Sequence, residues 1–241
     1  IKEQVKIYYG DLQSPESIAL ALLDFKPDEI YNLASMSSPL GSFTDKLTSI
    51  MVTGVGALNV FERAKQVVPD AKIYQASTSE MFGIPKQTPQ NEETPFSPAN
   101  PYAAAKEYAH RMAVISRNDK NEGQFISCGI LFNHESPRRG LNFVTRKISV
   151  AVACIKNKRG KNIPLNEIGE PIVQSGKLKL GDLGAKRDWG YAPDYIEAMW
   201  LMLQQERADD FVVATGETHA VGEFAEEAFK VVNLNWRDYV M

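Results

Sequence analysis

Short β-branched, apolar segments alternate with longer amphipathic segments along most of this chain, and no other feature restricts the possible folds as strongly. The short segments predict strands at residues 5–9, 29–33, 71–76 and 125–132. Between them, apolar residues recur at the spacing of a helix face. Residues 125–132 are apolar almost throughout, which is typical of a strand buried on both faces of a parallel sheet. The alternation therefore predicts an α/β fold built on a doubly wound parallel sheet.

The helices between the predicted strands begin with recognisable signals. Ser14 followed by Pro15 predicts a cap and the first turn of a helix that continues to Phe25. A long helix is expected within residues 47–67, and another over residues 100–117, with Pro101 near its start.

The rhythm changes after Asn133. Residues 142–154 predict a helix, and residues 156–176, which are rich in Lys, Asn, Gly and Pro, predict a loop or an insertion. The later elements expected are strands at residues 177–180 and 211–214, a helix through residues 200–205 that Asp194 caps, and a helix over residues 221–231.

Charge and composition exclude several classes of protein. The 241 residues include 27 Lys+Arg and 30 Asp+Glu, so the chain has no basic surplus of the kind that nucleic-acid binders carry. No apolar run approaches the roughly 18 residues of a membrane-spanning helix. Cys128 and Cys154 lie in apolar runs, which predicts buried, reduced thiols in a cytoplasmic protein. We therefore expect neither a nucleic-acid partner nor a membrane partner.

Tyr102 and Lys106 are four residues apart in a predicted helix, so their side chains share one face. A free tyrosine has a pKa of about 10, too high for a base at neutral pH. An ammonium beside it stabilises the phenolate and lowers that pKa. Such a tyrosine can remove a hydroxyl proton during hydride transfer. A chance match on a surface helix is the alternative, and the position after a third β-α unit favours the catalytic interpretation.

Two polar clusters directly follow predicted strands, at residues 77–80 and 133–140. Ligands of open α/β sheets bind outside the carboxyl ends of the strands. The first cluster supplies hydroxyls and a carboxylate there, and the arginines of the second suit a pyrophosphate or a carboxylate. The alternatives are a helix cap with an acidic first turn for the first cluster, and a surface turn with a salt bridge for the second. Arg187 is a further anion-binding candidate or plain surface charge.

Other apparent motifs are weaker. Gly54-Val55-Gly56 starts like a dinucleotide-binding fingerprint but lies inside a helical stretch, where small residues for close helix packing explain it better. His110, His134 and His219 are far apart in the sequence and show no metal-ligand spacing, so no metal site is expected.

From residue 5 to residue 236 the chain resembles the GDP-mannose 4,6-dehydratases of the extended short-chain dehydrogenase/reductase superfamily. The most specific stretches are residues 74–80, 129–140 and 181–195. The run from Gly129 to Gly140, GILFNHESPRRG, is particularly characteristic.

The resemblance implies conversion of GDP-mannose to GDP-4-keto-6-deoxymannose with NADP as cofactor. Hydride would leave C4, a base would remove the C5 proton, water would leave from C6, and the hydride would return to C6. Tyr102 would be the base for the C4 hydroxyl, and Lys106 would lower its pKa and hold the nicotinamide ribose. Thr78 would hydrogen-bond the C4 oxygen, and Glu80 would take the C5 proton and help water to leave.

The resemblance also implies the residues that contact the cofactor and the substrate. NADP would contact Asp11, Leu12, Leu33, Ala34, Ser35, Met36, Ser37, Thr48, Tyr102, Lys106, His134 and Arg139. The GDP-sugar would contact Asn133, Lys147 and Arg187.

Some positions depart from the family pattern. Ser38 stands where the family usually has His, Thr48 where members often have Tyr, and Tyr191 where many have His. These differences concern substrate fit, so a GDP-heptose dehydratase stays open as an alternative. An epimerase of another NDP-sugar, which needs no elimination base such as Glu80, and a non-catalytic descendant are the remaining alternatives.

The expected organisation also follows from the resemblance. Residues 1–140 would form an incomplete NADP-binding Rossmann-type domain, and residues 141–241 part of a GDP-sugar-binding region interleaved with the last strands. The family begins with a strand, a Gly-rich phosphate loop, a helix and a second strand, which this sequence does not contain. The chain is therefore expected to be a fragment whose sheet lacks its first two strands. A homo-oligomer is expected, a dimer or a tetramer, with the helices around Gly54 and Tyr102 as natural interfaces.

Overall fold

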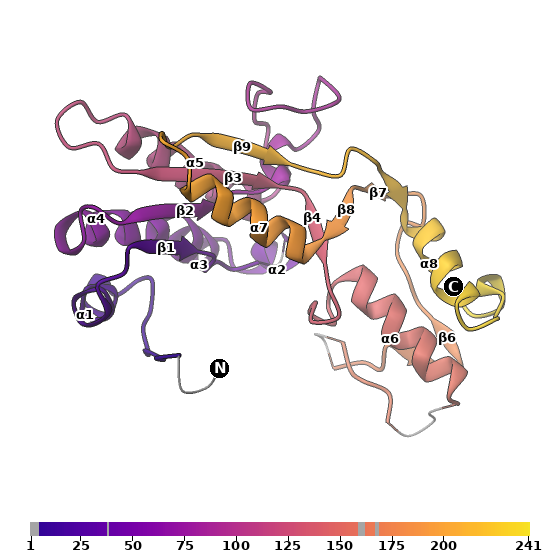
Figure 1. Ribbon diagram of the computed structural model, residues 1–241. Coiled ribbons are helices and arrows are strands. Elements are labelled where there is room, and N and C mark those ends of the chain that lie inside the picture. Colours follow the sequence, from indigo (N-terminus) through magenta and orange to yellow (C-terminus); the bar gives the residue numbers. More distant parts are fainter. Residues whose placement is uncertain (1–4, 38, 159–161, 167–168) are drawn as a thin grey trace. The chain divides into compact units, whose positions relative to one another are not determined.

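The computed structural model describes residues 5–37, 39–158, 162–166 and 169–241 (Figure 1). Ser38, one of the departures from the family pattern, lies outside the described residues. The chain forms two compact units: Ile1–Phe132 with Pro193–Val213, and Asn133–Ala192 with Ala214–Met241. The expected assignment of residues 1–140 and 141–241 to two functional domains stays a prediction.

The first unit is built on a parallel sheet. Its strands are β1 (Glu29–Asn32), β2 (Lys72–Ala76), β3 (Ile126–Leu131) and β9 (Asp210–Val213), in the spatial order β1-β2-β3-β9. Every neighbouring pair is parallel, with Tyr31 opposite Tyr74 and Leu131 opposite Val213. The α/β class with a doubly wound parallel sheet is therefore confirmed, and all these strands end at the same edge of the sheet.

Helices cover the two faces of this sheet because successive residues of a strand point to opposite sides. Ile73 of β2 packs in a core with α1 (Pro15–Phe25), α4 (Gly56–Val67) and α5 (Pro101–Arg117). Its neighbour Tyr74 packs on the other side, in a core with α7 (Ala192–Leu203). Every residue of β3 is buried, as its apolar run predicts.

Local signals place the helices where the sequence predicts them. The Ser14 side chain accepts a hydrogen bond from the backbone N–H of Ser17 and so caps α1. Asn100 caps α5 in the same way, and Pro101 occupies its first turn. The predicted long helix consists of α3 (Lys46–Ser49), a π-helical turn over Ile50–Val55, and α4. A short helix, α2 (Pro39–Thr44), precedes them.

Gly54 and Gly56 are needed for close packing. A Cβ atom on Gly54 would lie 3.0 Å from Cδ1 of Tyr108, and one on Gly56 would lie 2.7 Å from Cβ of Leu12. Close packing between helices is thus confirmed for Gly54, which faces α5, whereas Gly56 makes room for the turn that contains Leu12.

Two expectations about this unit are wrong. Residues 5–9 do not form a strand; they are exposed, and Lys6 and Tyr8 bind the carboxylate of Asp24 instead. A strand needs the hydrogen bonds of a neighbour, and the apolar pattern alone does not supply them. Asp194 does not cap α7 but lies inside it, because Pro193 fits the first helical turn and the helix begins at Ala192.

The second unit has small sheets and two main helices. β4 (Asn133–Glu135) pairs with β8 (Trp189–Tyr191), β7 (Lys186–Arg187) with β10 (His219–Ala220), and β5 (Val173–Gln174) with β6 (Lys177–Leu178). The core lies between α6 (Val144–Lys156) and α8 (Val221–Lys230), where Ile148, Leu178 and Phe229 are fully buried.

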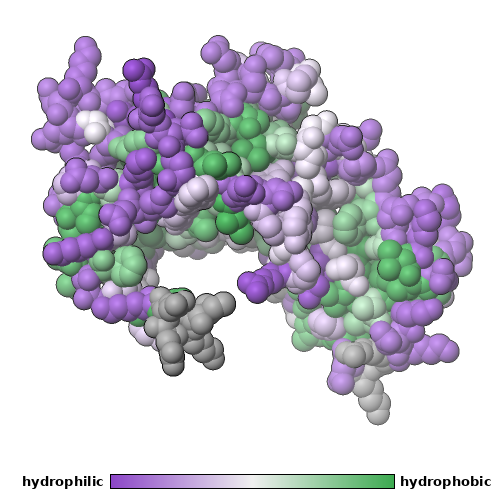
Figure 2. Space-filling view, viewed as in Figure 1, coloured by the Kyte–Doolittle hydropathy of each residue, from purple (hydrophilic) through white to green (hydrophobic). Residues whose placement is uncertain are grey.

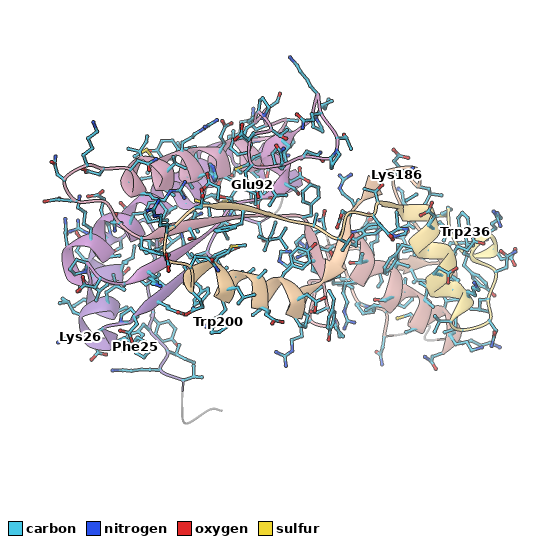
Figure 3. All side chains as sticks on the ribbon, turned by 45° about the horizontal axis from the view of Figure 1, so that its top comes forward. Phe25, Lys26, Glu92, Lys186, Trp200 and Trp236 are labelled. Atoms are coloured by element: carbon cyan, nitrogen blue, oxygen red, sulfur yellow. The ribbon has the colours of Figure 1, made fainter. Side chains whose placement is uncertain are left out.

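Some large hydrophobic side chains lie on the surface of the molecule. The face in Figure 2 is mostly hydrophilic, but hydrophobic residues reach the surface in several places. On α1 the exposed fractions are 68% for Leu20 and 63% for Phe25, and Trp200 on α7 is 51% exposed. Figure 3 labels Phe25 and Trp200. Cys128 and Cys154 are both buried, as expected. Within the described ranges, the helices are too short or too polar to cross a membrane.

Candidate active site

The face of α5 that carries Tyr102 and Lys106 packs against the carboxyl end of β2. The Lys106 Nζ lies 5.9 Å from the centre of the Tyr102 ring and donates a hydrogen bond to the carbonyl oxygen of Ala76 at 2.7 Å. Lys106 is only 3% exposed, and Tyr102 is half-buried. The alternative of a motif on a solvated surface helix is therefore wrong for Lys106.

Burial also changes the chemistry of this lysine. Because desolvation penalises the ammonium, the pKa of Lys106 is lowered to about 8. The backbone N–H of Tyr102 donates to the Ser42 hydroxyl oxygen at 3.1 Å, which fastens the first turn of α5 to α2. A polarisable phenol and a buried amine with a low pKa thus stand on one rigid helix.

Thr78 and Glu80 follow β2 directly. The Thr78 side chain caps the short 3-10 helix Ser79–Phe82 by accepting the backbone N–H of Glu80 at 3.3 Å. The cap interpretation of this cluster is therefore correct for Thr78. It does not exclude the catalytic one, because both side chains are half-buried and Glu80 holds its carboxylate toward α5.

Asn100 connects Glu80 with α5. Its Nδ2 donates to Oε2 of Glu80 at 3.2 Å, while its Oδ1 accepts the backbone N–H of Ala103 at 2.8 Å. Local sequence patterns predicted only the start of the helix here and missed the contact with Glu80. The signal was an Asn directly before the Pro-Tyr-x-x-x-Lys segment.

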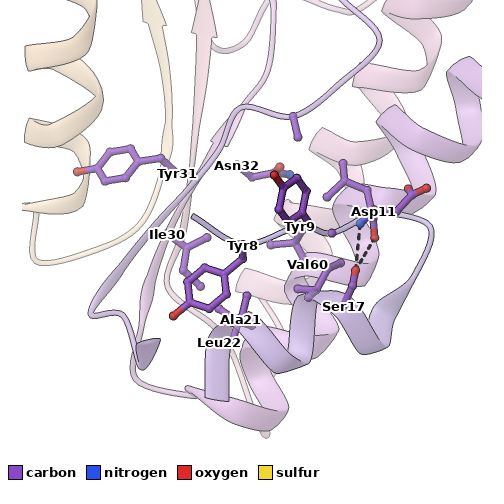
Figure 4. Close-up of a pocket in the computed structure, with 14 residues that line it drawn as sticks. Tyr8, Tyr9, Asp11, Ser17, Ala21, Leu22, Ile30, Tyr31, Asn32 and Val60 are labelled. Atoms are coloured by element: carbon purple, nitrogen blue, oxygen red, sulfur yellow. Dashed lines mark hydrogen bonds between the residues drawn. The ribbon is translucent and has the colours of Figure 1, made fainter. Parts of the chain in front are cut away.

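Asp11, Leu12 and Ala34, which are predicted to bind the cofactor, line a pocket of about 360 Å³ (Figure 4). Tyr8, Tyr9 and Ile30 supply much of its aromatic and aliphatic wall. Polar side chains come from Asp11, Ser17 and Asn32. A largely apolar wall with a few polar groups suits a flat heterocyclic base.

Hydrogen bonds hold the segment that carries Asp11. Its backbone N–H donates to the Ser17 hydroxyl oxygen at 3.0 Å (Figure 4). Its Oδ1 accepts the N–H of Gln13 at 2.9 Å. These bonds fix the loop against α1.

The other residues of the predicted cofactor loop lie after β1. Leu33, Ala34 and Ser37 are exposed, and Ser35 and Met36 are half-buried. The N–H of Met36 donates to the Thr53 hydroxyl oxygen at 3.1 Å. Thr48 lies in α3, where its N–H donates to Asp45 at 3.0 Å, and is not part of the pocket wall.

Other residues that are predicted to bind the cofactor or the substrate lie in the second unit. Asn133 and His134 lie in β4 and are half-buried. The Arg139 guanidinium stacks 3.6 Å above the centre of the Phe143 ring, and its Nε is 3.4 Å from Oε2 of Glu135. That contact is an ion pair without hydrogen-bond geometry, since Nε has no hydrogen-bond partner among the described residues.

Lys147 and Arg187 are held differently. Lys147 Nζ donates to the carbonyl oxygen of Lys179 at 2.8 Å, and partial burial lowers its pKa, with a smaller effect from the Lys179 charge. Arg187 is exposed in β7. The buried carboxylate of its neighbour Asp188 accepts the N–H groups of Thr215 and Gly216 at 3.0 and 2.9 Å. Asp188 therefore fixes the strand that carries Arg187.

Solved structures share the fold of this chain. RMD from Pseudomonas aeruginosa, complexed with NADPH, superposes with a TM-score of 0.84 at 22% identity, over 97% of this chain and 73% of that one. UDP-glucose 4-epimerase from Thermus thermophilus, complexed with NAD, gives 0.79 at 24% identity, over 100% of this chain and 73% of that one. The fold is that of the sugar-nucleotide epimerases and dehydratases.

Sequence comparison identifies the family within this class. A family model described as GDP-mannose 4,6 dehydratase matches residues 1–240, and the chain belongs to that family. GDP-mannose 4,6 dehydratase 1 of Arabidopsis thaliana is 46% identical over 99% of this chain and 62% of its own length. The Homo sapiens relative is 46% identical over 95% of this chain and 58% of its own. The chain thus spans about three-fifths of the length of these curated relatives.

Proposed function

We propose that the protein is a GDP-mannose 4,6-dehydratase, a lyase that converts GDP-mannose to GDP-4-keto-6-deoxymannose. The observation that carries this proposal is the Asn100–Glu80 hydrogen bond of 3.2 Å. It joins an acid/base carboxylate at the end of β2 to the helix of Tyr102 and Lys106. Oxidation at C4 and elimination across C5 and C6 need these two kinds of group beside one sugar ring.

Each candidate catalytic side chain has a task that its surroundings support. Tyr102 takes the proton of the C4 hydroxyl, and the Lys106 ammonium favours its phenolate form. Thr78 uses its oxygen to accept the Glu80 N–H, so its O–H can donate to the C4 oxygen.

Glu80 performs the elimination. It removes the C5 proton, and the C–H electron pair forms the C5–C6 double bond as the C6 hydroxyl leaves. A proton from the carboxyl group converts that hydroxyl into water. Asn100 donates to one carboxylate oxygen, which orients the group and leaves the other oxygen for the sugar.

The cofactor we propose is NADP, which supplies the hydride acceptor at C4 and the hydride donor to C6. Asp11, Leu12 and Ala34 would hold its adenine end in the pocket of about 360 Å³, and Tyr102 and Lys106 would hold the nicotinamide ribose. His134 and Arg139 are also proposed cofactor contacts, from the resemblance to the family. The buried, cationic Lys106 fits a ribose hydroxyl, and the apolar pocket wall fits a base.

The substrate contacts we propose are Asn133, Lys147 and Arg187. A primary ammonium and a guanidinium suit the diphosphate of a GDP-sugar.

We also propose a cytoplasmic homo-oligomer. Apolar residues on α3 and α5 support an interface there, since Leu47 is 72% and Ile115 61% exposed.

Mass spectrometry of the reaction tests the proposed function directly. GDP-mannose is incubated with NADP and the longest natural form of this chain, beside the 241-residue form. Loss of one water from the sugar nucleotide supports the proposal. Absence of water loss from the folded long form would contradict the proposal. The same assay with GDP-heptose would then test the alternative substrate. Absence of water loss from both sugar nucleotides would indicate a non-catalytic descendant.

A further inference from the structure

A second polar group surrounds His110, which lies on α5 one turn beyond Lys106. This group is buried and adjoins the segment of residues 77–80. His110 is 2% exposed and Ser77 7%. The Nδ1 of His110 lies 3.0 Å from the Ser77 hydroxyl oxygen, and its Nε2 lies 3.5 Å from Oδ2 of Asp210. The three residues come from α5, the end of β2 and the start of β9.

The neighbours of the imidazole assign its tautomer. A carboxylate is negatively charged and only accepts hydrogen bonds, so Asp210, 3.5 Å from Nε2, favours the tautomer with its hydrogen on Nε2. Burial lowers the pKa of His110, and the charges of Arg111 and Arg117 act in the same direction, against Asp210. The neutral ring therefore presents a lone pair at Nδ1, which accepts the Ser77 hydroxyl.

Asp210 is itself held in place. The Arg117 Nη1 donates to its Oδ1 at 2.9 Å and also to the carbonyl oxygen of Ile126 at 3.1 Å. The Phe96 ring meets the imidazole edge-on, with ring centres 5.1 Å apart. The buried Cys128 thiol also lies beside this group, with its sulfur within 4.8 Å of the ligand atoms of the imidazole and of Asp210. The imidazole is therefore enclosed by polar and aromatic neighbours that limit its movement.

Two other functions for this group conflict with its surroundings. A hydroxyl, an imidazole and a carboxylate in series can activate a nucleophile, but the buried Ser77 gives a substrate no access. His110, Cys128 and Asp210 have ligand atoms within 4.8 Å of one another, as a metal site requires. The Arg117 guanidinium on Asp210 opposes a cation there.

What the group does hold is the start of the segment of residues 77–80. Lys106 donates to the carbonyl of Ala76, and His110 binds the side chain of the next residue, Ser77. Lys106 and His110 are four residues apart on one helix face. The helix α5 thus hydrogen-bonds to two consecutive residues, Ala76 and Ser77, at the end of β2, immediately before the segment of residues 78–80.

We propose that His110 is a positioning residue for the dehydration. Through Ser77 it fixes Thr78 and Glu80 relative to Tyr102, and Asp210 holds it in the required tautomer. The inference rests on the proposed function, and it assigns His110 no contact with the sugar or the cofactor.

A matched pair of variants separates positioning from packing. His110→Asn places its amide near the position of Nδ1 and keeps the bond to Ser77, whereas His110→Gln reaches the position of Nε2 and keeps the contact with Asp210. We expect His110→Gln to lower kcat for water loss by roughly tenfold or more, with KM for GDP-mannose nearly unchanged, since small misplacements of reacting groups are costly. His110→Asn should retain most of kcat.

Amide hydrogen exchange gives a readout that needs no turnover. Exchange at residues 78–80 should accelerate in His110→Gln and in Ser77→Ala, but not in His110→Asn. The double variant Ser77→Ala/His110→Gln should have a kcat for water loss no lower than that of the slower single variant, because both substitutions remove the same bond. If His110→Gln does not fold, exchange at residues 78–80 and kcat for water loss are measured in Ser77→Ala instead.

Equal kcat and equal exchange in the Asn and Gln variants would overturn the proposal, as would a larger loss in His110→Asn. If wild-type protein releases no water, the proposed function fails while the exchange measurement still decides whether His110 holds the segment.

Discussion

Asn100 and Glu80 are joined by a hydrogen bond of 3.2 Å between Nδ2 and Oε2, although they belong to different elements 20 residues apart. The same Asn100 side chain caps α5 through its Oδ1. One amide therefore couples the position of the elimination base to the start of the helix that carries Tyr102 and Lys106. Substitutions at Asn100 can therefore change the helix cap, which affects stability, and the contact with Glu80, which affects catalysis, to different extents.

Glu80→Gln should abolish water loss while hydride exchange at C4 persists, because the amide cannot take the C5 proton. A loss of about 10²-fold or more in water release is expected for a general acid/base. Mass spectrometry measures water loss, and transfer of deuterium from C4 to the cofactor measures the first step. Tyr102→Phe is the contrasting variant, since it should slow the first step itself. Equal loss of both steps in Glu80→Gln would refute its assignment.

Asn100→Ser should separate the cap from the contact with Glu80. Serine also caps helices well, so the free energy of unfolding should change by less than about 1 kcal/mol. Its shorter side chain loses the bond to Glu80, so kcat should fall. Denaturant unfolding and steady-state kinetics measure the two effects. Asn100→Ala is the control and should lose about 1 kcal/mol of stability in addition. Wild-type kcat in Asn100→Ser would show that the Glu80 contact is dispensable.

The buried Lys106 should make stability depend on pH in the alkaline range. Its pKa is about 8 in the folded chain against an ordinary value of 10.5, so between these values the unfolded chain binds more protons. The free energy of unfolding contributed by this group is therefore complete above about pH 10.5 and is lost as the pH falls to about 8.

Lys106→Met should remove this dependence. The stability difference between wild type and variant should change by on the order of 3 kcal/mol between the two pH values, measured by urea unfolding at each. Lys26→Met, at an exposed position on the helix end, is the matched control. The same pH dependence in wild type and Lys106→Met would contradict the burial of the ammonium.

Gly129→Ala should destabilise the sheet. A Cβ atom at this position in β3 would lie 2.4 Å from the hydroxyl oxygen of Tyr74, which is fully buried. Overpacking of this kind costs about 1–3 kcal/mol, and thermal or urea unfolding measures it. Gly181→Ala is the control, because a Cβ there meets no atom within 4 Å. Gly129→Ala with unchanged stability would mean that Tyr74 moves aside without loss.

Most strand segments and helix starts could be predicted from the sequence because their apolar patterns and caps depend on neighbours along the chain. The run at residues 125–132 predicts a fully buried strand, and β3 is one. Ser14 and Asn100 cap their helices through residues only three positions away. The shared face of Tyr102 and Lys106 follows from helical periodicity alone.

The remaining features depend on residues that are distant in the sequence. Residues 5–9 have the pattern of a strand, but without a paired neighbour they bind α1 through Asp24 instead. The Lys106 ammonium meets the carbonyl of Ala76, and His110 meets Asp210, far along the chain. Local patterns indicate which segments can become helices or strands, because periodicity and caps depend on near neighbours along the chain, but a strand also needs a paired neighbour. Only the packed tertiary structure decides which side chains share a buried contact, because desolvation and long-range hydrogen bonds exist only after those segments meet.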